Sequence, residues 1–100
     1  MATISKQMYN GAASTSTTTL YTVPAATTAV VTEIVVTNPT SSAYTFTINL
    51  NGNVFIPFTT IASNSNITFD IKQTLNATQT ISANASSTSI NFFISGVEVA

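Results

Sequence analysis

The stretch from residue 20 to residue 38 constrains the fold of this chain more than any other. It contains a cluster of stiff, β-branched side chains: Val30, Val31, Ile34, Val35 and Val36. Such side chains favour extended backbone over helix. Pro24 cannot donate a hydrogen bond to a sheet ladder, so we expect it to end a short first strand before the chain turns. The stretch therefore predicts two consecutive strands, of which the second is long and apolar.

Alternation of apolar and polar residues continues through the rest of the chain. Every second residue from 44 to 50 is apolar, which predicts a half-buried antiparallel strand. Asn51-Gly52 follows as a strong hairpin signal, and Pro57 predicts that the next strand is an edge strand or contains a bulge. No helical period appears. The chain is therefore expected to be all-β, a small antiparallel β-sandwich of about seven or eight strands, with jelly-roll and immunoglobulin-like topologies both open.

The first nineteen residues are expected to lie outside this sandwich. Residues 2–9 alternate only weakly and are compatible with a first strand or an arm, and Asn10-Gly11 is a turn pair. Residues 12–19 form a low-complexity run of Ala, Ser and Thr, compatible with a loop, a flexible link or an extended edge segment. We therefore divide the chain into an N-terminal arm with a Ser/Thr linker (1–19) and a β-sandwich domain (20–100).

The last predicted strand changes phase at Gly96. Val97 and Val99 have the opposite parity to Ile94, with Glu98 between them. A bulge at Gly96 would keep both valines in the core. Without that bulge, Glu98 would share the face of Ile94.

Charged residues are scarce, at 5% of the chain against about 25% in an average soluble domain. The chain also has no Arg, His, Cys or Trp. Without Cys and His, the usual zinc, haem and iron–sulfur sites are not expected. With only two Lys, no basic patch can neutralise several phosphates. We therefore expect no cofactor, no metal and no nucleic-acid partner.

Catalysis is not expected either. General acid–base chemistry needs His or a pair of carboxylates, whereas Glu33, Asp70 and Glu98 each fall on the polar parity of a predicted strand. No base is evident beside a Ser or Thr nucleophile. The loops 51–53 and 64–66 lack the carboxylates of calcium sites and are interpreted as turns.

The chain shows no apolar run long enough to span a membrane and no N-terminal signal-peptide pattern. We therefore expect no membrane partner and synthesis in the cytoplasm.

A near-neutral surface of Ser, Thr and Asn favours a subunit of a permanent assembly over a freely diffusing monomer, because few charges remain to protect strand edges. Aromatic side chains are enriched at interfaces, so surface tyrosines favour a subunit contact over a sugar-binding platform. The strand around residues 30–36 has apolar residues on both parities. We therefore expect a second cover over it, from a neighbouring subunit or the N-terminal segment. The candidate interface residues are Ile4, Met8, Tyr9, Tyr21, Val31, Val35 and Phe93.

Several short segments of strand and turn residues are characteristic. In the first half they are LYTVPA (20–25), TAVV (28–31) and IVVTN (34–38). In the second half they are IA (61–62), NITFD (66–70), LNA (75–77), TISA (80–83) and ISGVEV (94–99). Together they resemble a group of small virion proteins of tailed bacteriophages, and the similarity spans residues 5–99. One departure lies in the turn after Pro24-Ala25, where Ala26-Thr27 stands in place of the expected Gly, Asn or Lys.

The resemblance implies a β-sandwich virion structural protein, made in the host cytoplasm and without enzymatic activity. Its expected role is a capsid decoration or cement subunit that binds the shell through uncharged surfaces. We expect it to form a homo-oligomer, with a trimer as the favoured state. A tail, baseplate or fibre component is the alternative, and a carbohydrate-binding or adhesin-like sandwich is a further one. The expected partners are other virion proteins, the major capsid or tail proteins.

Overall fold

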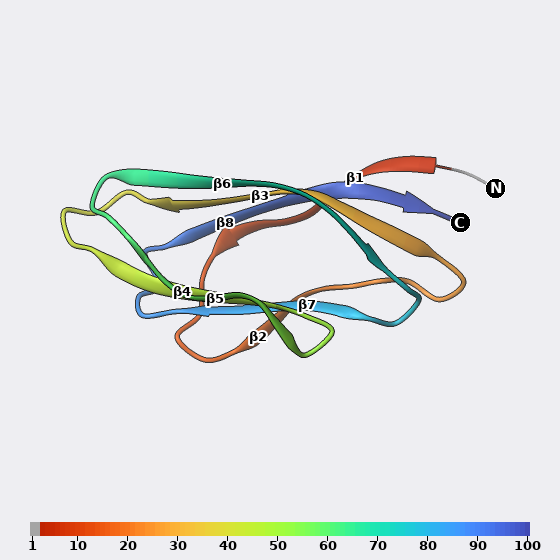
Figure 1. Cartoon of the computed structure of the whole chain (residues 1–100), viewed down its shortest axis with the longest axis horizontal. Helices are drawn as coiled ribbons and strands as arrows, with labels where there is room; N and C mark the ends of the chain where they lie inside the picture. The colour runs from red at the N-terminus through yellow and green to blue at the C-terminus, as the bar shows by residue number, and fades with distance from the viewer. Residues whose placement is uncertain (1–2) are drawn as a thin grey trace.

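The computed structural model describes residues 3–100 as eight strands, and the described part contains no helix and so none that could cross a membrane (Figure 1). The all-β prediction is confirmed. The strands are β1 (Thr3–Ala12), β2 (Thr18–Thr22), β3 (Thr28–Asn38), β4 (Tyr44–Leu50), β5 (Asn53–Ile61), β6 (Ser65–Leu75), β7 (Thr80–Ala85) and β8 (Asn91–Val99).

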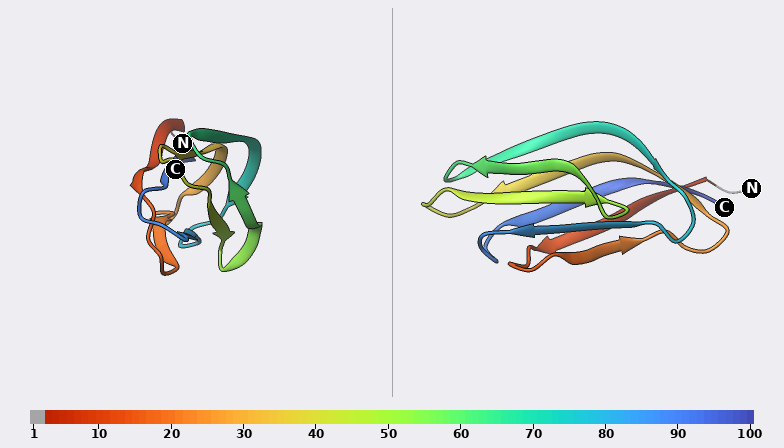
Figure 2. Two further views of the ribbon diagram at one scale, coloured as in Figure 1. Left: turned by 90° about the vertical axis from the view of Figure 1, so that its left-hand side faces the viewer. Right: turned by 60° about the horizontal axis from the view of Figure 1, so that its bottom comes forward.

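The strands form two four-stranded sheets, in the orders β1-β8-β3-β6 and β2-β7-β4-β5. Figure 1 shows the two sheets as separate layers, and Figure 2 shows that the strands run along the long axis of a 46 × 21 × 18 Å molecule. β1 pairs with β8, β2 with β7, β3 with β6 and β4 with β5, as in one long hairpin. The additional pairs β3–β8 and β4–β7 roll that hairpin into two layers. This is the eight-stranded jelly roll, one of the two topologies that the sequence left open.

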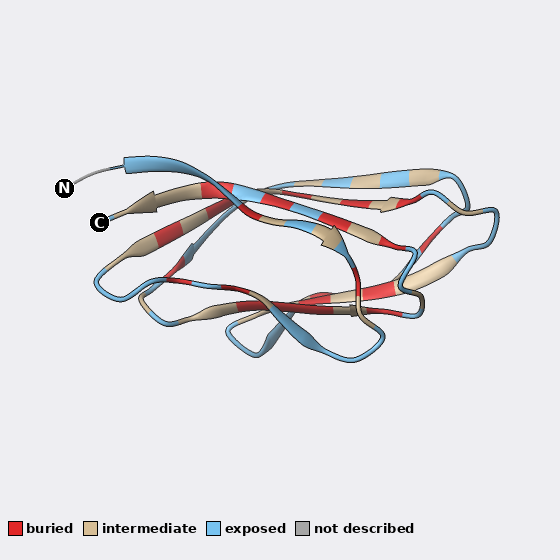
Figure 3. Ribbon diagram, turned by 180° about the vertical axis from the view of Figure 1, so that it is seen from behind, coloured by how far each residue is buried: buried red, intermediate tan, exposed pale blue. Residues whose placement is uncertain are grey.

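The core lies between the sheets and is built from the inward residues of both layers (Figure 3). Phe46 at its centre packs edge-on against Phe92 and Phe69, each with a ring centroid 6.2 Å away. The alternation predicted for residues 44–50 is confirmed, because Phe46 and Ile48 are fully buried there. Burial of these large side chains is the main favourable contribution to folding.

Gly96 determines how the long sheet is built, but not through a bulge of its own. β8 pairs continuously along its length, while its two neighbours each contain an extra residue near Gly96, Met8 in β1 and Thr32 in β3. A Cβ on Gly96 would overlap the Val30 carbonyl oxygen and lie 2.7 Å from Met8 Cε, so the neighbouring strands approach more closely than a side chain would allow. The Thr32 hydroxyl donates a hydrogen bond to the Ser95 carbonyl oxygen at 3.3 Å.

β8 therefore contains no bulge at Gly96, and the second of the two alternatives left open by the sequence holds. Glu98 continues the inward parity of Ile94, while Val97 and Val99 lie on the outer face and are half-buried. In β3 the extra residue Thr32 reverses the alternation of inward and outward side chains, so Val31 and Ile34 both point into the core.

The segment expected to be an arm is part of the sandwich. β1 pairs with β8 from Thr3–Val99 to Ala12–Asn91, and Met8 is buried in the core. The Ala13 amide then donates to the Ile90 carbonyl oxygen at 2.7 Å. The boundary at residue 20 therefore does not separate an arm from the sandwich. Residues 1–2 lie outside the described residues.

The turns follow local chemistry. Asn51 and Gly52 have φ angles of 51° and 78°, as expected for the predicted tight hairpin. Pro57 lies in β5, which is both an edge strand and irregular at this point, so the prediction from Pro57 is confirmed. Ala26, in the turn after Pro24, has a φ of 56°, a conformation that favours glycine or asparagine.

Candidate interaction surfaces

All charged side chains belong to one of the two sheets. All five, Lys6, Glu33, Asp70, Lys72 and Glu98, belong to β1, β3, β6 and β8. The β2-β7-β4-β5 sheet carries none. The two faces of the molecule therefore differ in what they can bind: one offers charge, and the other offers only hydroxyl, amide and apolar groups.

An apolar stripe lies on the outer face of the charged sheet, along its two central strands. It consists of two cross-strand pairs, Val30 with Val97 and Val35 with Phe93. Phe93 has 38% of its surface exposed and the valines are half-buried. We call these four residues the outer stripe. Apolar groups in the centre of a sheet face, rather than scattered singly, are typical of an interaction site.

One carboxylate lies within this stripe and another beside it: Glu33 pairs with Ser95 between the two apolar pairs, and Asp70 is its neighbour on β6. Glu33 and Asp70 are direct register partners on β3 and β6, and like charges placed opposite one another on a sheet repel. A cationic group from a partner would relieve this repulsion. Among residues 3–100, no group of three or more potential metal ligands occurs.

The seven predicted interface residues separate into two sets. Ile4 and Phe93 are exposed, and Tyr9 and Val35 are half-buried. Met8, Tyr21 and Val31 instead have their side chains in the core. The second cover expected over Val31 is the chain's own core, because the β3 bulge turns this residue inward. Val35 keeps its outward position.

Tyr21 joins the two sheets at their inner faces. Its hydroxyl, on β2, donates a hydrogen bond to Glu98 Oε2 on β8. Burial raises the pKa of Tyr21 above its usual value, and the hydrogen bond and negative charge of Glu98 raise it further. The polar, outward position expected for Glu98 is therefore wrong: it is half-buried and binds a core tyrosine. The unbroken alternation of Phe92, Ile94 and Glu98 was the signal for this inward position.

The edge strand β5 exposes two large apolar residues that the sequence did not single out. Phe58 is 76% exposed and Val54 is 64% exposed. Phe46 pairs with Thr59 and Ile48 with Ile56, so Pro57 and Phe58 together face the single residue Thr47. The bulge at Pro57 thus explains why Phe58 leaves the core face.

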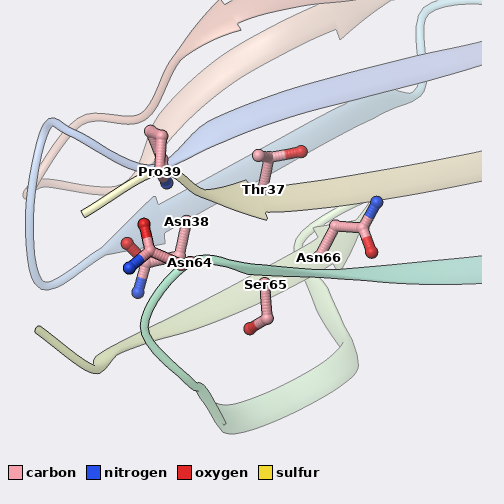
Figure 4. Close-up of a pocket in the computed structure, with 6 residues that line it drawn as sticks. All are labelled: Thr37, Asn38, Pro39, Asn64, Ser65 and Asn66. Carbon is pink, nitrogen blue, oxygen red and sulfur yellow. The ribbon is translucent and has the colours of Figure 1, made fainter. Parts of the chain in front are cut away.

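A polar pocket of about 450 Å³ lies at the ends of β3 and β6 (Figure 4). Thr37, Asn38, Pro39, Asn64, Ser65 and Asn66 line it. Asn38 is fully buried, and its amide nitrogen donates to the carbonyl oxygens of Ser42 at 2.7 Å and Ala62 at 3.1 Å. Its oxygen accepts from the Thr40 amide at 3.0 Å and the Thr40 hydroxyl at 2.7 Å. Asn38 therefore clamps two turns together and has no polar atom free for a ligand.

No protein-family model matches the chain, and no curated protein is similar to it at a significant level. Among solved structures, it is similar to a chain in the crystal structure of the T13 IBDV viral particle, with a TM-score of 0.55 and 8% sequence identity. The match covers 97% of this chain but only 30% of the viral chain. At this identity the likeness shows a shared fold alone.

Proposed function

We propose that the chain is a non-enzymatic virion structural protein, a capsid decoration or cement subunit of a tailed phage. The observation that carries the proposal is the outer stripe, which lies on the two central strands of the charged sheet and faces away from the core. The fold supports the proposal, because a chain of a viral particle shares it. The resemblance of the sequence to small phage virion proteins points the same way.

The mechanism is adhesion by burial. Phe93 and Val35 would be desolvated against the shell, while Glu33 and Asp70 beside them would accept a cationic side chain and orient the contact. Aromatic anchors at the centre of an interface carry much of its binding energy. Many copies on a shell would add avidity without new contacts.

Particles assembled without this protein test the role directly. Purified protein is added back, and its affinity per site is measured by co-sedimentation at concentrations where the free protein is monomeric. Phe93→Ser is expected to weaken binding about tenfold or more, because the anchor is lost from the centre of the contact. Phe58→Ser, the same substitution on the opposite sheet, is the matched control and is expected to keep the affinity per site. Unchanged binding by Phe93→Ser would contradict the proposal.

Electron microscopy of the reconstituted particles separates the head from the tail. Added density on the head lattice supports decoration, whereas density on the tail or baseplate assigns the protein to the alternative role.

Deletion of β1 is no clean test of an N-terminal contact, since it removes Met8 from the core. A sugar platform is not favoured, because Tyr21 is buried and the Tyr9 hydroxyl already donates to the Ala12 carbonyl oxygen at 2.7 Å.

A further inference from the structure

The outer face of the β2-β7-β4-β5 sheet combines neutrality with an apolar edge. Its centre consists of hydroxyl and amide side chains, Thr45, Thr47 and Asn49 of β4 and Ser82 and Asn84 of β7. Its border is the exposed side of β5, which carries Val54, Pro57 and Phe58. We call these three residues the β5 apolar edge.

This edge is unsuited to extending the sheet. Pro57 lacks a backbone donor, and the bulge there interrupts the regular ladder, both of which protect edge strands from pairing with another strand. A partner would therefore bind through side chains on the outer face rather than through backbone hydrogen bonds. An aromatic ring 76% exposed at such a site has the properties of an anchor.

We propose that this face binds the same face of a second copy of the chain, with Phe58 as the anchor of the contact. The inference rests on the proposed function, because it assigns the contact between copies of that virion subunit. The distribution of charged residues indicates which partner this face binds. A typical protein surface would bring unpaired charges against a face that has no counter-charge, and their desolvation opposes binding. A second copy presents an equally neutral face and keeps all five of its charged side chains on its other sheet.

The size of the face limits the strength of the contact. Four strands spaced about 4.8 Å apart and about seven residues long at about 3.3 Å each project roughly 440 Å² per copy. Two copies would then bury on the order of 900 Å², which is below the range of standard stable interfaces. We therefore expect reversible association that depends on the concentration of the free protein in solution.

Sedimentation equilibrium of the whole chain, without particles, tests the contact from about 1 µM to about 1 mM, the range of weak association. The average mass is expected to rise above the 10.5 kDa of one chain with concentration. Phe58→Ser, and independently Thr47→Lys, are expected to raise the dissociation constant about tenfold or more, the first by removing the anchor and the second by bringing like charges together. Phe93→Ser on the opposite sheet is the matched control and should leave the mass unchanged. Circular dichroism confirms that each variant is folded.

Three outcomes would overturn the inference: a chain that stays monomeric at the highest concentration, a mass that changes with Phe93→Ser but not with Phe58→Ser, or a mass insensitive to both Phe58→Ser and Thr47→Lys. These results are independent of the particle assay. Loss of self-association by Phe58→Ser with unchanged affinity per site on particles supports both proposals. Self-association without any particle binding supports the contact between copies and contradicts the virion role.

Discussion

Replacement of Gly96 by Ala tests whether close approach to this glycine holds the two bulges in place. The added methyl group would overlap the Val30 carbonyl oxygen in β3, which is backbone and held in the ladder. On the other side it would lie 2.7 Å from Met8 Cε in β1. The methionine can change its rotamer, but the Val30 carbonyl moves only if β3 shifts relative to β8.

The expected cost follows from these contacts. Overpacking of a well-packed interior costs about 1–3 kcal/mol, and the involvement of backbone places Gly96→Ala at the upper end, about 3 kcal/mol. For a domain of this size, about 1 kcal/mol corresponds to about 4–8 °C in melting temperature. The variant should therefore melt about 12 °C or more below the wild type.

Thermal and urea unfolding, followed by circular dichroism, measure this difference. Gly11→Ala in β1 is the matched control, because the three atoms nearest to a Cβ there all belong to the Tyr9 side chain, with the hydroxyl oxygen 3.3 Å away. We expect that control to change the free energy of unfolding by less than about 1 kcal/mol. Equal melting temperatures for the two variants would show that the strands do not need a glycine at position 96, and the explanation of the bulges would then fail.

Two further predictions concern the turn at Ala26 and the link between the sheets. Ala26→Gly should stabilise the fold by about 0.5–1 kcal/mol in urea titrations, because Ala26 adopts a left-handed conformation that favours glycine; a loss of stability would contradict this. Tyr21→Phe should cost about 1.5–3 kcal/mol at pH 7, since the Glu98 carboxylate loses its donor. The pKa of Tyr21 is raised in the folded state, so its contribution is complete below about pH 10, the pKa of an unperturbed tyrosine, and declines as the pH rises beyond it. Between about pH 10 and pH 12 the wild type should therefore lose stability more steeply than Tyr21→Phe, and parallel pH profiles would refute this.

The outer stripe was predicted in part from the sequence, whereas the β5 apolar edge was not. Val35 and Phe93 were candidates because each is an apolar residue on the face of its strand that points away from the core. The structure shows that they are cross-strand neighbours on the outer face. Val97 shares the outward parity of Phe93 along the unbroken strand β8, and Val30 joins the stripe only because the bulge in β3 reverses the parity between Val31 and Glu33. Phe58 followed the alternation of an ordinary strand, and its exposure depends on the bulge at Pro57.

What the sequence by itself determined is local. The β-branched cluster at residues 30–36, the alternation at residues 44–50, the Asn51-Gly52 hairpin and the irregular edge at Pro57 all arise from backbone and side-chain preferences within a few residues, so they could be predicted correctly. The scarcity of charge is also a property of the sequence alone.

Only the tertiary structure decided how these elements combine. The pairing of Thr3–Ala12 with Asn91–Val99 joins opposite ends of the chain, and no local preference records such a partner. The bulges in β1 and β3 also depend on contacts between distant residues, because Gly96 lets the two neighbouring strands approach closely. The inward position of Glu98 likewise depends on a distant residue, since its carboxylate accepts a hydrogen bond from Tyr21 of the other sheet. The segregation of all charged side chains onto one sheet likewise depends on which strands become neighbours, since residues far apart in the chain acquire a common face only when the jelly roll closes.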